Sequence, residues 1–223
     1  EAGRYVITDD NKRSVPEYPD EMKTLFPRMW STQRGSHQTT YESYRKSPSG
    51  NIVGENVRVR NYLGETVTDS KPTFGQNLKF FIDYQCNWMY WRYFMWNFVG
   101  RQNDIESQGE LNHGNWLSGI SFIDNARLGD QDNIPACMKN PGRTTYYFLP
   151  LILGLIGLFW LLKRDLKQSW IIFLLFFLTG LAIVIYLNQT PNQPRERDYS
   201  YAGSFYAFAI WIGYGVIALI DLV

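Results

Sequence analysis

The sequence of 223 residues contains little cysteine, little histidine and almost no net charge. Its two Cys residues exclude a scaffold held by many disulfides and a zinc site with several cysteine ligands. Because 22 basic residues stand against 21 acidic ones, a protein that binds nucleic acid through bulk charge is also excluded. The chain has no glycine-rich phosphate loop, no serine–histidine–aspartate arrangement and no internal repeat, and we expect neither a cofactor nor a nucleic-acid partner.

Charge is nearly missing from the last third of the chain. Five basic and four acidic residues follow Thr145, compared with 17 of each before it. Three runs in this part contain no charged residue: 146–162, 170–187 and 201–220. At a rise of about 1.5 Å per residue, runs of this length are roughly 26 to 30 Å long, close to the ~30 Å hydrocarbon core of a bilayer. We predict three transmembrane helices over these runs.

The part that precedes these runs is polar and divides into two regions. Residues 1–72 are predicted to form an irregular α/β lobe, because short alternating segments at 4–8 and 56–60 are separated by Gly, Pro, Asn and Ser. Residues 73–145 are predicted to hold an aromatic helix followed by a glycine-containing loop region. The membrane helices occupy residues 146–223.

The predicted fold class is an α-helical integral membrane segment with three transmembrane helices, an irregular α/β extracytoplasmic lobe and an amphipathic aromatic interfacial helix. Since the chain begins at Glu1 and ends in an apolar run, we interpret it as an internal segment of a larger multi-pass protein. The short link 163–169 predicts an antiparallel hairpin. Three basic residues in this link stand against four on the other side, so the charge count does not fix the orientation.

The stretch from Leu78 to Val99 is predicted to be a helix, and ten of its 22 residues are aromatic. Its opposite face carries polar residues together with Tyr90 and Phe94. Apolar residues at spacings of three and four share the other face: Leu78, Phe81, Tyr84, Trp88, Trp91, Met95 and Phe98.

This helix contains Lys79, Asp83 and Arg92, and each charge would cost at least ~2.5 kcal/mol inside a membrane. A helix lying in the membrane interface fits better, since Trp and Tyr favour that depth. An amphipathic core helix of the polar lobe is the alternative. As an interfacial helix it would line a cleft in which aromatic rings stack on sugar or lipid, while Asp83, Asn87 and Asn97 hydrogen-bond hydroxyl groups.

Three strings in this sequence resemble one family of large bacterial inner-membrane proteins. They are WMYWRYFMWNF at 88–98, followed by GRQND at 100–104, then TLFPRMW at 24–30 and QTPNQPRERDY at 189–199. That family, long described only as a domain of unknown function, is related to a eukaryotic protein O-mannosyltransferase of the C-type (GT-C) class of membrane glycosyltransferases. The resemblance covers nearly the whole chain.

The resemblance implies a parent enzyme that transfers a sugar from a polyprenyl-phosphate-linked donor to a protein or glycan acceptor on the extracytoplasmic side. The acidic catalytic residue of such enzymes lies in the first external loop, which precedes this segment, so no catalytic residue is assigned here. The resemblance also implies that Lys163–Lys167 face the cytoplasm, that residues 1–145 are extracytoplasmic, and that the protein lies in the bacterial inner membrane.

Arg195 and Arg197 would then lie at the external mouth of the second and third membrane helices. Two guanidinium groups there would bind the phosphate of the lipid-linked donor through paired hydrogen bonds. Alternatively, Glu196 and Asp198 neutralise these arginines in a local ion-pair cluster.

Arg101 and Asp104 form a second candidate pair directly after the aromatic helix, with helix termination as the alternative role. Adding this pair to the polar and aromatic residues of the helix gives the predicted sugar and acceptor cleft. Its members are Asp83, Asn87, Trp88, Trp91, Asn97, Arg101 and Asp104.

Two other residue pairs are weaker candidates, one for a metal site and one for a disulfide. Glu110 and His113 have the spacing of a metal-binding pair on a helix, but glycines interrupt any helix there and a second such pair is missing, so we predict no metal site. Cys86 and Cys137 would form a disulfide in an oxidising compartment. A free, buried thiol is favoured for Cys86, since it falls within the aromatic helix.

A second hypothesis assigns no catalysis to the chain. The parent would be a membrane scaffold that docks an envelope protein, and the Phe, Tyr and Trp side chains would anchor that interface. A partner that copurifies in stoichiometric amount would favour this alternative.

Overall fold

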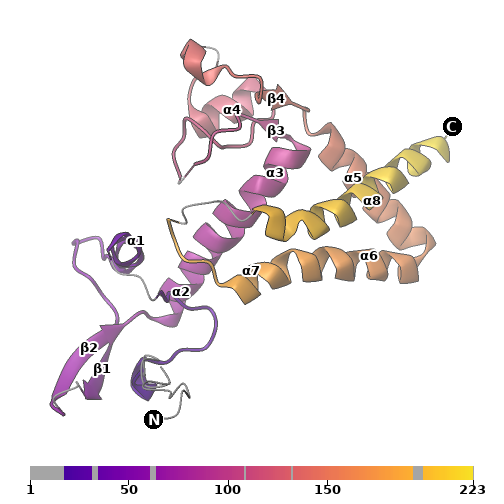
Figure 1. The fold of residues 1–223 in the computed structure, drawn as a ribbon. Coiled ribbons are helices and arrows are strands. Elements are labelled where there is room, and N and C mark those ends of the chain that lie inside the picture. The colour runs from indigo at the N-terminus through magenta and orange to yellow at the C-terminus, as the bar shows by residue number, and fades with distance from the viewer. Residues whose placement is uncertain are drawn as a thin grey trace, which may run out of the picture.

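The computed structural model describes residues 18–31, 35–60, 64–107, 109–131, 133–192 and 198–222, and most of its elements are helices (Figure 1). They form an N-terminal lobe, a long aromatic helix that leads into a loop-rich lobe, and a group of apolar helices. The N-terminal lobe and the C-terminus lie at opposite ends of the molecule, as all views agree.

The N-terminal lobe combines short helices with a small sheet. The sheet consists of two antiparallel strands, in which Glu55 pairs with Lys71 and Arg60 with Thr66. The predicted strand at 56–60 is confirmed, whereas the segment 4–8 lies outside the described residues. The elements of this lobe are η2 (Asp20–Met22), α1 (Ser36–Arg45), β1 (Glu55–Arg60) and β2 (Thr66–Lys71).

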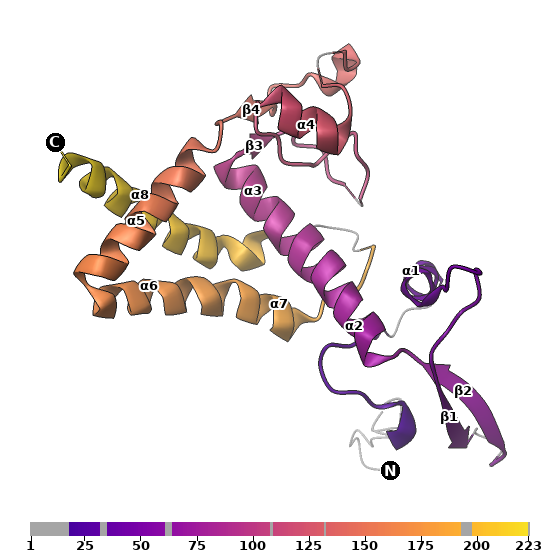
Figure 2. The ribbon, with the colours of Figure 1, turned by 180° about the vertical axis from the view of Figure 1, so that it is seen from behind.

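The aromatic helix is unbroken and connects the two lobes (Figure 2). It consists of α2 (Phe74–Phe80), the π-helical η3 (Phe81–Trp91) and α3 (Arg92–Phe98). Thr73 begins it with a capping box: the Thr73 hydroxyl accepts from the Gln76 amide, and the Gln76 side chain accepts from the Thr73 amide. The predicted helix is therefore confirmed, and it begins four residues earlier than expected.

The predicted apolar face of this helix is confirmed only at its end, where Met95 and Phe98 are buried. The segment η3 is π-helical, and i→i+5 hydrogen bonds place more residues in each turn than an α-helix holds. The buried residues of η3 are Gln85, Met89 and Tyr90, and the residues that the 3.6-residue period places on the apolar face of this segment are only partly buried or exposed. As a result Trp91, expected on the apolar face, is 45% exposed, while Phe94, expected opposite, is 2% exposed.

The loop-rich lobe is organised around a two-residue strand pairing and one short helix. Gly100 has a φ of 142°, and a Cβ there would lie 2.4 Å from the Leu117 carbonyl oxygen. Only glycine allows the backbone to pass this close to residue 117. The buried carboxylate of Asp124 accepts from the amides of Ser118 and Gly119 at 2.9 and 2.7 Å. The elements are β3 (Gly100–Arg101), α4 (Ser121–Leu128), η4 (Ala136–Met138) and β4 (Thr144–Thr145).

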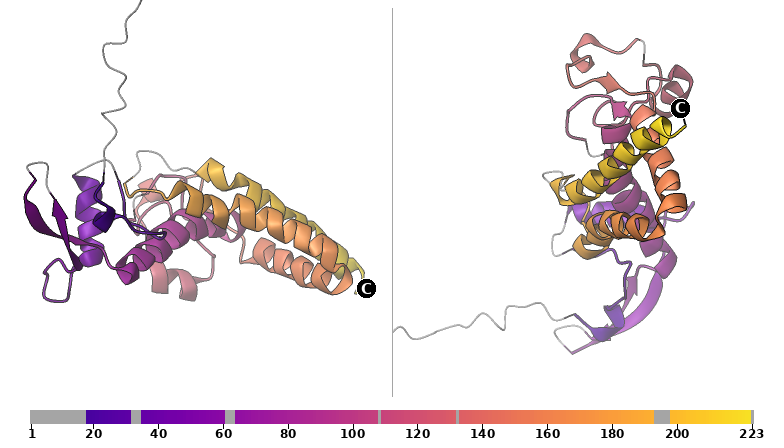
Figure 3. Two further views of the ribbon diagram at one scale, coloured as in Figure 1. Left: turned by 90° about the horizontal axis from the view of Figure 1, so that it is seen from below. Right: turned by 90° about the vertical axis from the view of Figure 1, so that its right-hand side faces the viewer.

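The apolar helices follow and extend away from the N-terminal lobe (Figure 3). Two segments, Leu166–Leu187 and Tyr199–Ile220, have 22 residues each and are long and apolar enough to cross a membrane. In their most apolar windows only 17% and 33% of the residues are buried. Apolar helices exposed on most faces require a covering of lipid or protein, so these segments indicate membrane association. The elements are α5 (Leu149–Arg164), α6 (Leu166–Thr179), α7 (Leu181–Leu187), η5 (Asp198–Tyr201) and α8 (Ala202–Ile220).

The first predicted span, 146–162, corresponds to a shorter helix. Tyr147 and Phe148 have positive φ angles of 51° and 60°, so α5 begins only at Leu149. Its 16 residues give a length of about 24 Å, below the ~30 Å of a hydrocarbon core. The structure therefore supports two of the three predicted spans by length.

The link between α5 and α6 is much shorter than predicted. Asp165 alone separates the helices, and its carboxylate accepts from the amides of Lys167 and Gln168 at 3.0 Å each. This side chain caps α6, so the residues expected to form a loop are helical instead. At the same end of the molecule, Arg164 forms an ion pair of 2.7 Å with Asp221.

The helices α5 and α8 cross in very close contact. A Cβ on Gly157 would lie 1.8 Å from the Trp211 carbonyl oxygen, and one on Gly215 would lie 2.1 Å from the Leu153 carbonyl oxygen. Such glycines allow two helix backbones to approach closely, as membrane helices commonly do. The aromatic helix packs on this pair through Phe94, Met95, Phe98 and Val99.

Candidate functional site

An apolar groove lies between the aromatic helix and the bent pair α6–α7. It has a volume of about 470 Å³, within the range of ligand-binding clefts. One wall comes from the aromatic helix and the other from α6 and α7. The lining residues are Ile82, Cys86, Asn87, Tyr90 and Trp91 on the first wall and Phe173, Phe176, Phe177 and Leu181 on the second.

The second wall bends because the helix is interrupted at Gly180. The backbone of Gly180 has a φ of −113° and a ψ of −97°, which ends α6 before α7 begins. The Thr179 hydroxyl donates to the Leu175 carbonyl at 2.6 Å, a bond that often accompanies a helix bend. The bend places the phenylalanines of α6 and Leu181 of α7 around one groove.

A chain of buried hydrogen bonds fixes the aromatic helix at this bend. The Tyr90 hydroxyl donates to the Ser204 hydroxyl at 3.2 Å, and Ser204 donates to the Tyr201 carbonyl at 2.8 Å. The Tyr90 and Tyr201 rings meet edge to face at 5.3 Å. Since Ser204 is fully buried in α8, the groove wall has a rigid support.

The structure places two predicted cleft residues at this groove. Asn87 lies on the exposed rim, and Trp91 is 45% exposed and stacks on Phe94 at 5.3 Å. An amide and an indole at the edge of an apolar groove can hydrogen-bond a hydroxyl and stack on a ring.

The other helix residues of the predicted cleft lie elsewhere. Asp83 is exposed and faces α1, where burial and, second, the Asp83 charge raise the pKa of Tyr44. The Trp88 ring lies under the Arg92 guanidinium at 4.5 Å. The Asn97 amide donates to the Tyr93 carbonyl of its own helix at 2.8 Å.

Arg101 and Asp104 serve the loop-rich lobe. The Arg101 guanidinium stacks over the Trp96 ring at 4.0 Å. The Asp104 carboxylate accepts from the Asn140 amide at 2.8 Å, and Gly142 packs closely against it. The two side chains therefore have different partners and do not converge with Asn87 and Trp91 in one cleft.

Arg195 and Arg197 lie outside the described residues, but the described residues that precede them contact the aromatic helix and α1. Gln85 of the aromatic helix donates to the Gln189 carbonyl at 2.7 Å. Gln189 is 4% exposed, and within the described part of the chain neither polar atom of its side-chain amide has a hydrogen-bond partner. Farther along, Asn192 donates to the Ser36 carbonyl of α1 at 3.3 Å.

The remaining candidate groups are the two cysteines and the possible metal ligands. Cys86 is a free, half-buried thiol, and burial raises its pKa to about 11. The side chain of Cys137 lies outside the described part of the chain. Among the described residues, no group of three or more His, Cys, Asp and Glu side chains could hold a metal ion.

Comparison with known proteins gives one family match. A family model described as "Family of unknown function (DUF8416)" matches residues 1–82. No curated protein matches this chain. No solved structure matches it either. The match spans the N-terminal lobe and the start of the aromatic helix, so most of the groove lies beyond it.

The sequence interpretation missed the second wall of the groove and the bend that forms it. Phe173, Phe176 and Phe177 belong to the apolar run 170–187, which by composition predicts only a membrane span. The Thr179–Gly180 pair inside that run was the available signal, since glycine and serine or threonine favour helix bends. Their meeting with the aromatic helix depends on tertiary packing, which spacing along the chain does not give.

Proposed function

We propose that this chain is a segment of a bacterial inner-membrane glycosyltransferase. The enzyme would transfer a sugar from a polyprenyl-phosphate-linked donor to a protein or glycan acceptor on the extracytoplasmic side. The apolar groove between the aromatic helix and α6–α7 supports this proposal most directly. Its walls offer few hydrogen-bonding groups, and each Å² of apolar surface that a hydrocarbon chain buries there contributes about 25 cal/mol.

The proposed membrane arrangement uses three spans, over 146–162, 170–187 and 201–220. Residues 1–145 would be extracytoplasmic, with the aromatic helix in the interface, and Lys163–Lys167 would face the cytoplasm. In favour of this arrangement, two of the spans have the required length and the charged residues Arg164 and Asp221 pair at the end away from the aromatic helix. The carrier would then lie against the helices with its hydrocarbon chain in the groove.

In the proposed reaction an acceptor hydroxyl attacks the anomeric carbon of the donor sugar. The bond from that carbon to the phosphate oxygen breaks, and polyprenyl phosphate leaves with the bonding electron pair. A general base in another part of the parent protein takes the hydroxyl proton. Arg195 and Arg197 would stabilise the departing phosphate, and Asn87 and Trp91 would contact the sugar at the rim of the groove.

A groove-filling substitution tests the lipid site. Cys86→Trp adds an indole to the wall, so sugar transfer by the full-length protein in liposomes should require at least tenfold more polyprenyl-phosphate-linked donor for half-maximal rate. Cys86→Ser is the matched control and should transfer as the unchanged protein does, because it changes the thiol without adding bulk to the wall. Equal donor requirements in the two variants would overturn the lipid site.

Substituting the arginines tests the phosphate role. Arg195→Ala and Arg197→Ala should each lower the transfer rate at least tenfold in the same liposomes, with the thermal unfolding midpoint unchanged. Arg58→Ala, an exposed arginine of β1, is the control for loss of one positive charge. Full transfer by both variants would refute the assignment.

A non-catalytic scaffold that docks an envelope protein is the second candidate. One observation favours it: Phe122 of α4 is 86% exposed and Leu111 of the same lobe is 63% exposed. Exposed apolar side chains that form one patch mark docking surfaces, and in this candidate Phe122 and Leu111 would belong to such a patch. Loss of a copurifying envelope protein in Phe122→Ser, together with no sugar transfer in any form, would favour the scaffold.

A further inference from the structure

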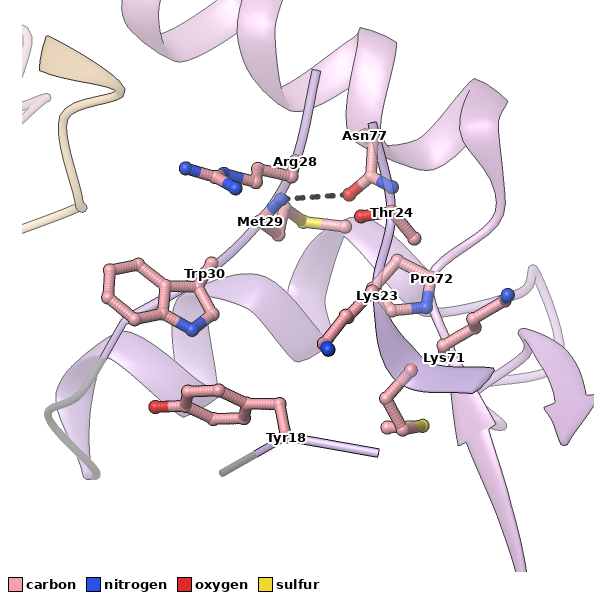
Figure 4. A pocket seen from close by; sticks show the side chains of 10 residues that line it. Tyr18, Lys23, Thr24, Arg28, Met29, Trp30, Lys71, Pro72 and Asn77 are labelled. Carbon is pink, nitrogen blue, oxygen red and sulfur yellow. Dashed lines mark hydrogen bonds between the residues drawn. The ribbon is translucent and has the colours of Figure 1, made fainter. Parts of the chain in front are cut away.

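We propose that the N-terminal lobe carries a binding pocket for an anionic saccharide, separate from the groove at the aromatic helix. The pocket has a volume of about 480 Å³ (Figure 4). All of its lining residues lie within the segment matched by the family model. Those that carry the inference are Tyr18, Lys23, Arg28, Trp30, Lys71 and Asn77.

Hydrogen bonds from different elements fix the walls of this pocket. Asn77 of α2 is 2% exposed, and its side-chain oxygen accepts from the Met29 amide at 2.9 Å. Tyr41 of α1 donates to the Trp30 carbonyl at 3.1 Å. Lys71 at the end of β2 donates to the Glu21 carbonyl at 2.9 Å. The segment that carries the ligand-facing residues is therefore held in place before any ligand arrives, as in most small-molecule sites.

The charge of the pocket is positive. Three of its lining residues are cations, and none is Asp or Glu. Lys23 pairs with Asp20, and the Lys71 ammonium lies 3.8 Å from the Glu55 carboxylate. The Lys23–Asp20 pair is exposed on both sides, and such surface pairs contribute little. The Lys71–Glu55 pair is long, and its acidic partner is 59% exposed, so both cations still attract an anion.

Arg28 is the cation best suited to recognise the anionic group. Its guanidinium lies 5.9 Å from the centre of the Trp30 ring, and it forms no ion pair with any described residue. A planar guanidinium binds carboxylate or phosphate through two parallel hydrogen bonds. The Trp30 ring and the Arg28 guanidinium are therefore neighbours. A ligand would place an apolar face against the ring and an anionic group at the guanidinium.

The aromatic wall favours a saccharide as the rest of the ligand. Tyr18 and Trp30 meet edge to face at 6.2 Å, and Figure 4 shows them together on one side, with Lys71 across from them. The apolar C–H face of a sugar ring stacks on such rings, while its hydroxyls reach Thr24 on the pocket wall. A phosphorylated sugar and a uronic acid share this chemistry. The inference does not depend on glycosyl transfer.

Calorimetric titration of the full chain in phosphatidylcholine nanodiscs, in buffer free of phosphate, tests the proposal. The probes are glucose 6-phosphate, glucuronate, glucose, inorganic phosphate and a hexaglutamate peptide. We expect saturable one-site binding of glucose 6-phosphate or glucuronate, at least tenfold tighter than glucose or inorganic phosphate. Whichever of the two binds more tightly identifies the anionic group.

Three variants make the test specific. Arg28→Gln and Trp30→Ala should each weaken saccharide binding at least tenfold, whereas Arg58→Gln, which removes the same charge from β1, should leave it unchanged. Circular dichroism should give the same helix content for all three. Absence of saturable binding, equal binding of inorganic phosphate or of hexaglutamate, or an equal loss in Arg58→Gln would each overturn the proposal.

Discussion

The Tyr90 hydroxyl lies directly against Gly180, in the gap where α6 ends and α7 begins. A Cβ on Gly180 would be 2.6 Å from that hydroxyl oxygen and 2.8 Å from the Phe176 carbonyl oxygen. The same hydroxyl donates to Ser204, so one contact joins the aromatic helix, the bend and α8. The shape of the groove therefore depends on the absence of a side chain at position 180.

Gly180→Ala should destabilise the protein by about 1 to 3 kcal/mol, because the added methyl group forces Tyr90 or the helix backbone to move. Thermal unfolding in micelles, followed by tryptophan fluorescence, measures the effect. Gly213→Ala is the control, since a Cβ there meets nothing within 4 Å and alanine favours a helix. In a double-mutant cycle, Tyr90→Phe should recover part of the loss by removing the hydroxyl. Strictly additive effects would contradict the contact.

Gly157→Ala should be more damaging than Gly180→Ala. Its Cβ would lie 1.8 Å from the Trp211 carbonyl oxygen and 2.5 Å from the Gly215 amide nitrogen, which are backbone atoms that cannot rotate away. We expect a loss of about 3 kcal/mol or more, since α5 and α8 must separate. The same unfolding assay ranks the two variants. A smaller effect at position 157 than at 180 would show that the close crossing is absent.

Local patterns in the sequence predicted the longest helices and one strand of this fold but not their contacts. The apolar runs, the aromatic helix and the strand at 56–60 are set by composition and periodicity over a few residues. The face of the aromatic helix differs from the prediction because a 3.6-residue period does not hold where η3 is π-helical. That period placed Trp91 on the wrong face of the helix. The first apolar helix is shorter than its run because Tyr147 and Phe148 have positive φ angles.

The candidate site was predicted only in part for a related reason. Asn87 and Trp91 do reach the groove, but Asn97 and Arg101 were grouped with them by closeness in the sequence. In the structure Asn97 bonds to its own helix and Arg101 stacks on Trp96. The second wall comes from residues about 90 positions later, around Phe177, and no spacing within the aromatic helix could indicate them.

The Cys86 thiol should react slowly. Burial raises its pKa to about 11, from a usual value near 9, so the reactive thiolate fraction at pH 8 is roughly 100-fold smaller than for an exposed cysteine. Maleimide labelling should be correspondingly slow in a chain with Cys137→Ser. Adding the exposed Ser49→Cys to Cys86→Ser in that background provides the fast control. Equal rates at both positions would contradict the burial.

The same thiol predicts a direction for stability at high pH. Its folded-state pKa lies above that of the unfolded chain, so the unfolded chain loses the proton first as pH rises. The stability that the neutral thiol contributes is complete below about pH 9 and declines between about pH 9 and 11. Cys86→Ala should lose less stability over this interval, as measured by the unfolding midpoint. A parallel decline in both proteins would exclude Cys86 as the cause.

Arg92 joins the aromatic helix to the loop-rich lobe, and its removal should loosen that joint. Its side chain is 6% exposed, donates to the Gly114 carbonyl, donates to the Trp88 carbonyl at 3.1 Å and lies 4.5 Å above the Trp88 ring. Arg92→Met should cost about 2 to 3 kcal/mol, because it leaves a buried carbonyl without a charged donor. Arg92→Lys keeps the charge but lacks the planar fork, so its cost should fall between those of Arg92→Met and the unchanged protein.

Hydrogen exchange separates this local role of Arg92 from a general loss of stability. In Arg92→Met the amides of residues 110–117 should exchange faster, while those of α8 should keep their protection, because the lobe opens without the helices that carry the groove. Lys79→Met, an exposed site on the same helix, is the matched control and should leave both regions unchanged. Faster exchange in α8 to the same degree as in 110–117 would mean that Arg92 supports the whole fold rather than this joint.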